Sequence, residues 1–491
     1  MEENDYNILN ANSVNVYMLP FTNANSDSEF VVNIEELKKL GWLEKDLSLT
    51  SNIDYDSLKT NFACHQYFNE SSKRIFGSED KEDYFCKVFE LPKEILQGAT
   101  YEIITNDIKY KLNIRSIELH LYNFNVGILL FTVSNDDYHR YQDIKVINDL
   151  SRRISMSYLP GKIANDMNLS TADYVRISKD NNVLVEHNYK QIILDSILRE
   201  HKGLDQLREP MPLIDFILNN KFNKSNTTSR IAIHPFDDDR MFLMCFIRNT
   251  ELSSLIENHF NDDYAKDLLY SIIYVDKEDS TCQNSKMRDD LLDNSMDKRW
   301  SNYGTLHAVT NYSFFLITSK FPGINDSVIR PFLYEYKYLM SLVLAQRFAI
   351  IRFSALALRY AKLEKVERKV VKLKEEYCRF ENQFLLSEMT NQDQGIEMYR
   401  LMQKQLFVKE ELQALMEPLN NLGDIAKLRI DEIKNRRLLV ITLLGSFFAA
   451  YGIIMNLEEN VKTAEAKAWI LVLIVGLILI FVYCVITHKE E

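Results

Sequence analysis

The chain has 491 residues, of which 46% are hydrophobic and 26% are charged, and its formal net charge is -12 at pH 7. This composition is typical of a globular protein with a membrane segment and excludes a largely disordered chain. The acidic balance argues against a general nucleic-acid binder, whose contact surface is basic. The length leaves room for about three domains of roughly 150 residues each.

The six cysteines are scattered along the chain, without a CxxC pair or a metal-ligand spacing. This pattern predicts ordinary reduced thiols in a cytosolic body. The amino terminus, Met1-Glu2-Glu3, lacks the basic start and apolar run of a signal peptide. We therefore expect membrane insertion to depend on segments near the carboxyl terminus.

Residues 1–205 are predicted to form an N-terminal cytosolic α+β region. The clearest signal is the run 117–133, in which alternating and β-branched residues surround a hairpin turn at 123–127. A helical period follows in 138–154. Shorter strand-like runs cover 14–20, 30–33 and 84–91.

Residues 206–330 are predicted to form a second cytosolic α+β subdomain, with a boundary near 205. Its helix-like stretch covers 252–275, and the polar run 219–229 is expected to be a loop. Its strand-like runs cover 230–234, 241–248 and 307–318.

Residues 331–437 are predicted to form a long helical hairpin, or stalk, that begins at Pro331 and turns at 389–395. Apolar residues spaced by three and four form the seam of a packed hairpin or coiled coil. They are Leu363, Val366, Val370, Leu373, Tyr377, Phe380 and Phe384. The second helix, from Ile396 onward, continues into the membrane, and 60 residues would make a rod of about 90 Å. Such a rod cannot bury itself alone, so we expect a homo-oligomer.

Two uncharged runs of 20 residues, 438–457 and 468–487, are each long enough to cross the hydrocarbon core of a bilayer. The connection 458–467 is short, so both termini are expected on one side of the membrane. Lys434, Arg436 and Arg437 precede the first run, and positive flanks stay in the cytoplasm. The sequence therefore predicts a multi-pass membrane protein with cytoplasmic termini.

Small and polar residues share one face of the first predicted span. They are Thr442, Ser446, Ala449, Gly452 and Asn456. Two interpretations are about equally favoured: close packing between membrane helices, for which small residues are typical, and the wall of a pore.

An acidic stripe below this face favours the pore. Glu410, Glu417, Asp424 and Asp431 recur every seven residues. Asn435 continues the stripe toward Thr442. In a ring of subunits such a stripe would raise the local cation concentration, while the alternative is a solvated helix face. Glu458 and Glu459 add carboxylates at the outer loop, and oxygen ligands of this kind suit hydrated Mg²⁺. Asp424 and Asp431 are therefore candidate cation ligands.

No constellation predicts catalysis. The chain has no phosphate loop and no GxGxxG motif. The run 237–239 of three aspartates is interpreted as a charged loop, and His120 and His234 as satisfied or surface histidines. We expect the protein not to be an enzyme.

From the stalk to the carboxyl terminus, 331–491, the chain resembles the CorA family of divalent cation transporters. The family signature Tyr-Gly-Met-Asn is matched in two halves, Tyr451-Gly452 and Met455-Asn456, which two isoleucines separate. The resemblance implies a pentamer in the inner membrane of a bacterium, with Mg²⁺ as the conducted ion. It also implies that Asn456, with Gly452 and Met455 nearby, holds the cation at the outer mouth.

The 330 residues that precede Pro331 exceed what a simple transporter of this family carries. This pattern, together with the segment 300–313, resembles the divergent CorA-like proteins associated with type III CRISPR systems. That resemblance implies an antiviral effector gated by a nucleotide second messenger, such as a cyclic oligoadenylate or an adenosylmethionine-AMP conjugate. The remaining alternative is a non-conducting membrane tether that carries a ligand-binding domain.

Overall fold

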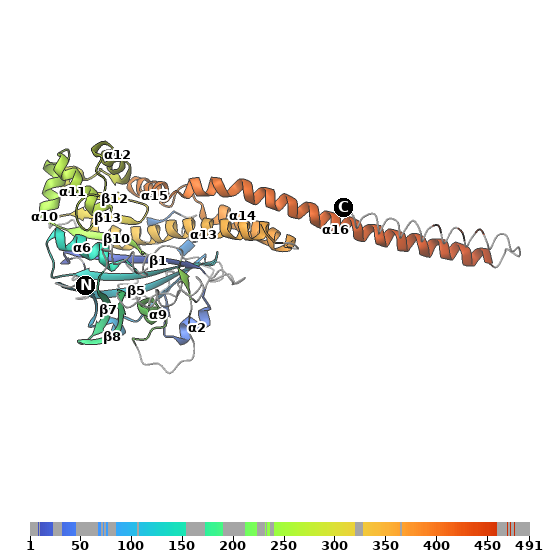
Figure 1. Cartoon of the computed structure of the whole chain (residues 1–491), viewed down its shortest axis with the longest axis horizontal. Helices are drawn as coiled ribbons and strands as arrows, with labels where there is room; N and C mark the ends of the chain where they lie inside the picture. The colour runs from blue at the N-terminus through green and yellow to red at the C-terminus, as the bar shows by residue number, and fades with distance from the viewer. Residues whose placement is uncertain are drawn as a thin grey trace, which may run out of the picture. The chain divides into compact units, whose positions relative to one another are not determined.

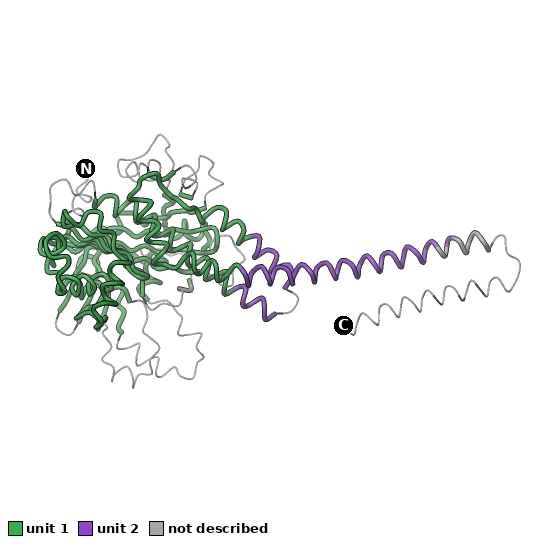
Figure 2. The backbone as a smooth tube through the Cα atoms, turned by 90° about the horizontal axis from the view of Figure 1, so that it is seen from above, with its two compact units in different colours: residues 1–355, 376–416 green, residues 356–375, 417–491 purple. Residues whose placement is uncertain are grey.

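The computed structural model describes most of the chain, and the chain divides into two compact units (Figure 2). One unit is Met1–Ala355 with Glu376–Met416, and the other is Leu356–Glu375 with Glu417–Glu491. The described residues are 8, 10–22, 32–45, 67–69, 72, 75–76, 85–105, 108–153, 172–189, 212–222, 231, 233–235, 240–319, 328–363, 366–458, 469, 472 and 476.

A mixed sheet forms the centre of the first unit (Figure 1). Its main path runs β11-β12-β13-β10-β1-β6-β5-β4-β7-β8, while β2 and β3 join at β5 and β9 joins at β1. The pair β10–β13 is parallel, and the other recorded pairs are antiparallel. The thirteen strands in the described residues are β1 Ser13–Thr22, β2 Leu43–Glu44, β3 Cys86–Glu90, β4 Ala99–Ile104, β5 Lys109–Tyr122, β6 Val126–Asn135, β7 Tyr174–Lys179, β8 Asn182–Asn188, β9 His234–Pro235, β10 Phe242–Arg248, β11 Met296–Asp297, β12 Leu306–Val309 and β13 Ser313–Thr318.

Strand β1 joins the two regions that the sequence suggested as separate subdomains. It pairs with β6 on one side and with β10 on the other. Strands from 1–205 and from 206–330 therefore lie in one sheet, so the sheet continues across the predicted boundary near 205. Pairing between β1 and β10 is a non-local contact, which local sequence patterns do not reveal.

The β5–β6 hairpin confirms the strongest strand prediction. Its turn is Asn123 to Asn125, and Asn125 adopts a left-handed φ of 62°. Gly127 follows in β6, where an added Cβ would lie 2.6 Å from Cε2 of Phe21. Only glycine fits at that approach of β6 to the Phe21 ring. The predicted strands at 14–20, 84–91 and 241–248 are confirmed as β1, β3 and β10.

Other local predictions needed correction. The run 307–318 is the hairpin β12–β13 rather than one strand, and the stretch 252–275 is two helices, α10 Thr250–Asn258 and α11 Asp263–Ile273. The described part of 30–33 is not a strand, because Asn33 caps α2 Ile34–Lys39: its Oδ1 accepts a hydrogen bond from the amide of Glu35. The predicted strand at 230–234 contributes only His234 to β9 in the described residues.

Helices cover both faces of the sheet. On one face, α6 Tyr141–Ser151 and α9 Pro212–Leu218, with α10 and α11, enclose the main hydrophobic core. On the other face lies α13 Lys337–Ala361, which continues from a π-helical turn at Phe332–Tyr336. Phe332 packs on Phe314 of β13 with ring centroids 4.8 Å apart. Shorter helical elements are α5 Lys93–Leu96, α12 Ser285–Ser295 and a 3-10 turn Ser301–Tyr303.

The helical region after the sheet is confirmed. It consists of α14 Glu367–Phe384, α15 Asp393–Gln405 and α16 Val408–Glu458. The predicted seam from Val370 to Phe384 is buried, but Leu363 is 48% exposed because α13 has already ended at Ala361.

The predicted second stalk helix is interrupted in the structure. The chain leaves α15 at Leu406, and Phe407 takes a left-handed φ of 53° before α16 begins. Pro418 lies inside α16, where it removes one backbone hydrogen bond. The continuous helix is therefore α16 alone, which has 51 residues.

Candidate functional site

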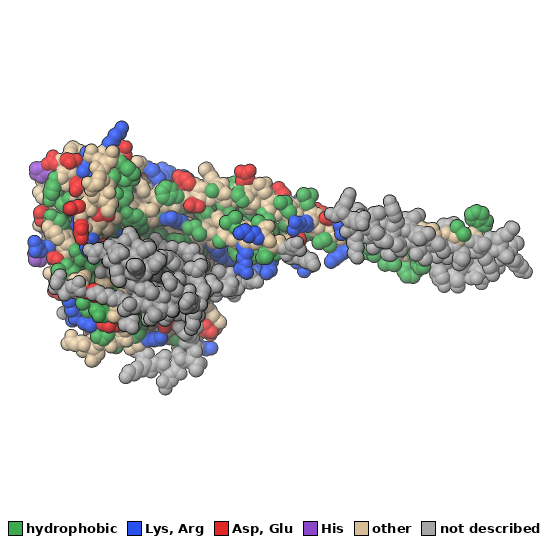
Figure 3. All heavy atoms as spheres, in the orientation of Figure 1, with side chains coloured by type: hydrophobic (Ala, Val, Ile, Leu, Met, Phe, Trp, Pro, Cys, Tyr) green, Lys and Arg blue, Asp and Glu red, His purple; other side chains and the backbone are tan. Residues whose placement is uncertain are grey.

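The part of α16 from Leu438 onward is an exposed apolar segment. Leu438, Ile441 and Phe448 are 58%, 64% and 67% exposed, and other large apolar side chains in 438–448 are also uncovered (Figure 3). A contiguous exposed apolar surface marks a contact with another protein or with a membrane. Arg436 and Arg437 are exposed at the start of this segment. The described side chains of the first predicted span thus lack protein neighbours that would cover them.

In the described part of the chain, the helix that has the length and apolar composition to cross a membrane is not α16. Among the described residues, Phe332–Ala361 meets these two conditions. Most of this segment is buried, and it packs on the sheet through Phe332 and Ser341. We therefore assign it to the core of the first unit. The second predicted span, 468–487, lies outside the described residues except at 469, 472 and 476.

The polar residues predicted to line an ion path all belong to helix α16. Thr442 Oγ1 donates to the carbonyl of Leu438 at 2.8 Å, and Ser446 Oγ donates to the carbonyl of Thr442 at 2.9 Å. These bonds satisfy both hydroxyls within the helix. Asn435, Ala449 and Gly452 are exposed.

The side chains at the outer end of the predicted ion path lie outside the described residues. Met455, Asn456 and Glu458 belong to α16, but their side chains lie outside the described residues, as does all of Glu459. The predicted selectivity ring at Asn456 therefore stays a prediction.

The candidate cation ligands do not converge within one chain. Asp424 and Asp431 are exposed on α16, and seven residues separate them by about 10 Å along the helix axis. Asp431 Oδ1 lies 3.8 Å from Lys434 Nζ. The described residues contain no group of three or more His, Cys, Asp or Glu side chains that could hold a metal ion. A cation site at these positions would need side chains from several copies.

A buried polar network joins β5 to α13 in the first unit. Glu118 Oε1 lies 2.6 Å from Lys337 Nζ, and Glu118 Oε2 lies 3.3 Å from His120 Nε2. Ser341 Oγ lies 2.9 Å from His120 Nδ1 and 3.0 Å from the hydroxyl of Tyr122. Burial raises the pKa of Glu118, but the charges of Lys337 and Lys45 outweigh it and hold that pKa well below its usual value. Burial lowers the pKa of His120, which favours the neutral imidazole.

Ser341, His120 and Glu118 stand in the order of a hydroxyl, imidazole and carboxylate relay. Ser341 and His120 are 0% exposed and Glu118 is 4% exposed, so a substrate has no path to the hydroxyl from the surface. This network is better explained as a structural link between sheet and helix. The prediction that His120 is a satisfied histidine agrees with its two hydrogen-bond contacts.

A cluster of arginines lies where α6 ends beside the start of β10. Arg152 is the C-cap residue of α6, and its carbonyl accepts a hydrogen bond from the amide of Met241 at 2.7 Å. Arg153 pairs with Arg240 in an isolated antiparallel bridge. No local sequence pattern indicated this cluster. The signal available was the Arg152-Arg153 pair at the end of a predicted helix, but nothing local connects that pair to Arg240.

Comparison with protein families, with curated proteins and with solved structures found no match.

Proposed function

We propose that the protein is a membrane-bound, homo-oligomeric cation channel of CorA-like architecture, with Mg²⁺ or another divalent cation as the conducted ion. The observation that supports this proposal best is the exposed apolar segment of α16 directly after Arg436 and Arg437. Burying such a segment in lipid removes its apolar surface from water, and the arginines stay at the cytoplasmic interface. The first span would then begin near Leu438.

Exposed apolar residues below the span support an oligomer. Ile425 and Leu428 are 50% and 70% exposed, although they precede the predicted membrane segment. They lie three residues apart and so share one face of α16. Neighbouring copies of α16 would cover this face, as in the helical assemblies that bury such seams.

Cation conduction is supported by the polar stripe on the same helix. Asp424, Asp431, Asn435 and Thr442 follow one another at intervals of seven, four and seven residues, so they share one face of α16. Copies arranged around an axis would present rings of oxygen atoms at these positions. Rings of carboxylates concentrate cations at a pore entrance. Asn456 would form the outermost ring of this path.

A non-conducting tether is the second candidate. The internal hydrogen bonds of Thr442 and Ser446 favour it, because satisfied hydroxyls can also face lipid or a packed neighbour. A tether would need the same membrane segment but no water-filled axis.

The test is Mg²⁺-dependent dye response in proteoliposomes that contain the purified chain. Thr442→Leu and Asn456→Ala are expected to reduce flux at least tenfold, whereas Phe448→Leu, on a different helix face, should leave flux near the wild-type value. Unchanged flux in both pore variants would reject the pore assignment. No flux in any sample, with the chain inserted, would favour the tether.

Gating by a nucleotide second messenger is a separate part of the proposal and follows from the resemblance. Adding cyclic oligoadenylates or adenosylmethionine-AMP conjugates on the stalk side of the same proteoliposomes tests it. Flux that requires the messenger would support the antiviral effector, and flux that ignores it would support a constitutive transporter.

A further inference from the structure

A basic face on α14 lacks a carboxylate partner among the described residues. It consists of Arg368, Val371 and Lys372, which lie on one exposed side of the helix, and Val371 is 36% exposed. Arg368 and Lys372 are four residues apart, and like charges at this spacing repel each other. Glu375 follows one turn later, but no ion pair of these charged residues is recorded in the described part of the chain. A partner with carboxylates would therefore stabilise the basic face.

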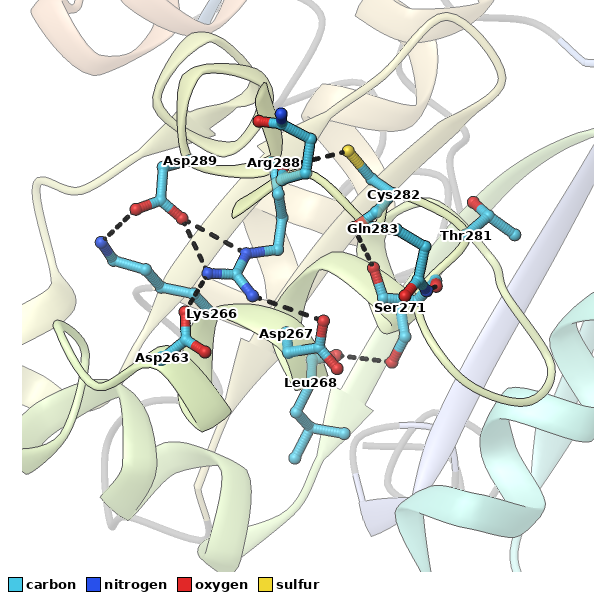
Figure 4. A network of polar contacts seen from close by, with 12 residues as sticks. Asp263, Lys266, Asp267, Leu268, Ser271, Thr281, Cys282, Gln283, Arg288 and Asp289 are labelled. Atoms are coloured by element: carbon cyan, nitrogen blue, oxygen red, sulfur yellow. Dashed lines mark hydrogen bonds and ion pairs between the residues drawn. The ribbon is translucent and has the colours of Figure 1, made fainter. Parts of the chain in front are cut away.

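A cluster of charges in the first unit shows how the chain pairs them internally. The guanidinium of Arg288 contacts the carboxylates of Asp263, Asp267 and Asp289 (Figure 4). Asp289 also lies 2.7 Å from the ammonium of Lys266. Positive and negative side chains thus alternate there. The basic face of α14 has no such arrangement among the described residues, so its carboxylates would have to come from another molecule.

A complementary face on α16 combines one carboxylate with two exposed apolar side chains. Asp424 and Leu428 are four residues apart and share one side of the helix, and Ile425 lies beside Asp424. Ile425 and Leu428 are 50% and 70% exposed. Within the described ranges, no ion pair of Asp424 is recorded. We call these three residues the acidic face, which matches the basic face in both charge and apolar character.

Two contacts within the second unit determine how α14 and α16 lie beside each other. Glu367 Oε1 lies 3.7 Å from Arg429 Nη1. At Gly423, an added Cβ would lie 2.8 Å from Cδ of Lys374. The contact moves forward along α14 while it moves backward along α16, so the two helices are antiparallel.

This antiparallel register places the basic face and the acidic face at the same height. Lys372 and Asp424 are each five residues from the ion pair that joins the two helices. Val371 and Ile425 are each four residues from it. Both helices rise by about 1.5 Å per residue, so the members of each pair are level. Within one chain the acidic face points away from α14, because Asp424 lies about 200° around α16 from the buried Ala426.

We propose that the basic face of one chain docks on the acidic face of a second copy of the same chain. Rotation about an axis along the helices keeps every residue at its height, so Lys372 meets Asp424 of the neighbouring copy. Val371 then packs against Ile425 of that copy. Because the two faces differ, the contact is head to tail, and repeated rotation closes a ring. This inference rests on the proposed homo-oligomer and names the contact that holds it together.

The contact takes Asp424 away from the proposed ion path but leaves Asp431. Asp431 lies two residues beyond Arg429 toward the first predicted span, past the level of Glu367, where α14 begins. It is therefore beyond the contact between the two faces. The ion path would then depend on Asp431 and on the polar residues that follow it.

A second copy fits the basic face better than a lipid headgroup does. Lys372 is level with Asp424, which lies fourteen residues before Leu438, where the first predicted span begins. This separation corresponds to about 21 Å along the helix, and the headgroup layer covers only about 6 Å of it. The remainder exceeds the Debye length of about 8 Å at physiological salt, so headgroup charges are screened at Lys372.

The first test measures the mass of the full-length chain in detergent without phospholipid, over a dilution series. Lys372→Glu should raise the midpoint concentration of assembly at least about tenfold, because it sets a carboxylate against Asp424 of the neighbouring copy. Asp424→Lys should have the same effect, and the double variant, with the charges exchanged, should assemble near the wild-type concentration. The matched control is Lys286→Glu, an equal charge change at an exposed position of α12, which should leave assembly unchanged.

The second test is carbodiimide coupling, which joins a lysine amine to a carboxylate that touches it. An oligomer assembled from equal amounts of isotope-labelled and unlabelled chain should give a Lys372–Asp424 cross-link with one labelled and one unlabelled half. Lys372→Arg keeps the charge but not the amine, so it should keep the oligomer and lose this cross-link. This variant also tests the contact if Lys372→Glu fails to fold.

Three results would overturn the proposal. They are an oligomer that neither charge reversal weakens, single variants that the double variant fails to rescue, and assembly that requires added phosphatidylglycerol and gives no mixed cross-link. The last result would assign the basic face to lipid headgroups. A monomer at every concentration would reject both this contact and the proposed oligomer, whereas a cross-linked oligomer without Mg²⁺ flux in proteoliposomes would reject the channel and leave the contact standing.

Discussion

The buried ion pair between Glu118 and Lys337 gives the sharpest stability prediction. Their side chains are 5% and 9% exposed, and the Oε1 to Nζ distance is 2.6 Å. Replacing Lys337 by methionine leaves the Glu118 carboxylate buried with only the weaker fields of Lys45 and His120. Breaking a buried pair in this way lowers the free energy of unfolding by about 3 to 5 kcal/mol. Because Lys45 and His120 still stabilise the carboxylate, we expect a loss near the lower end, about 3 kcal/mol.

A double-mutant cycle separates the pair from other effects of the substitutions. Glu118→Gln alone should also cost about 3 kcal/mol, because it leaves the Lys337 ammonium unpaired. The double variant should lose much less than the sum, with a coupling energy of at least about 2 kcal/mol. Urea unfolding of the detergent-solubilised chain, followed by the fluorescence of Trp42, which is 1% exposed, measures each value.

An exposed pair serves as the control cycle. Lys38 and Glu44 are 3.0 Å apart, but their side chains are 48% and 37% exposed. Exposed pairs contribute no more than about 1 kcal/mol, since water and salt screen them. A Glu118–Lys337 coupling energy equal to that of this surface pair would refute the reasoning that α13 is held to the sheet by a desolvated charge pair.

Three further predictions concern a buried histidine, a glycine and the membrane segment. Burial lowers the pKa of His307 to about 4. The unfolded chain therefore takes up a proton near pH 6.5, at which the folded chain leaves this histidine neutral. The free energy of unfolding should fall by about 2 kcal/mol from this group as the pH drops from 7 to 5. His307→Leu should show a flatter pH profile in urea unfolding, and a profile parallel to the wild type would contradict the assignment. Gly304 has a φ of 63°, and an added Cβ would lie 2.6 Å from the carbonyl oxygen of Ser253, so Gly304→Ala should cost about 3 kcal/mol in the same assay. Phe448→Asp should release the chain from membranes on carbonate extraction, because a carboxylate near the middle of the predicted span 438–457 costs about 3 kcal/mol. Ile425→Asp, before the span, should leave the chain bound, and equal retention of both variants would contradict the position of the span.

Local pattern was sufficient for the elements whose signal lies in neighbouring residues. The β5–β6 hairpin followed from alternation around a turn, and the seam from Val370 to Phe384 followed from the helical period, because both depend on contacts close in sequence. The uncharged run that begins at Leu438 was equally visible, since hydropathy is read from consecutive residues and needs no contact distant in the sequence.

The sheet order and the buried polar sites were decided by the tertiary structure alone. Strand β1 pairs with β10 across more than two hundred residues of sequence, and Lys337 reaches Glu118 across a separation of 219 residues. No local period encodes such pairings, because each strand has a suitable face for several partners. The same holds for Arg152 and Arg240: the sequence determined that these residues are charged, and only the fold placed the buried Arg152 near the half-buried Arg240.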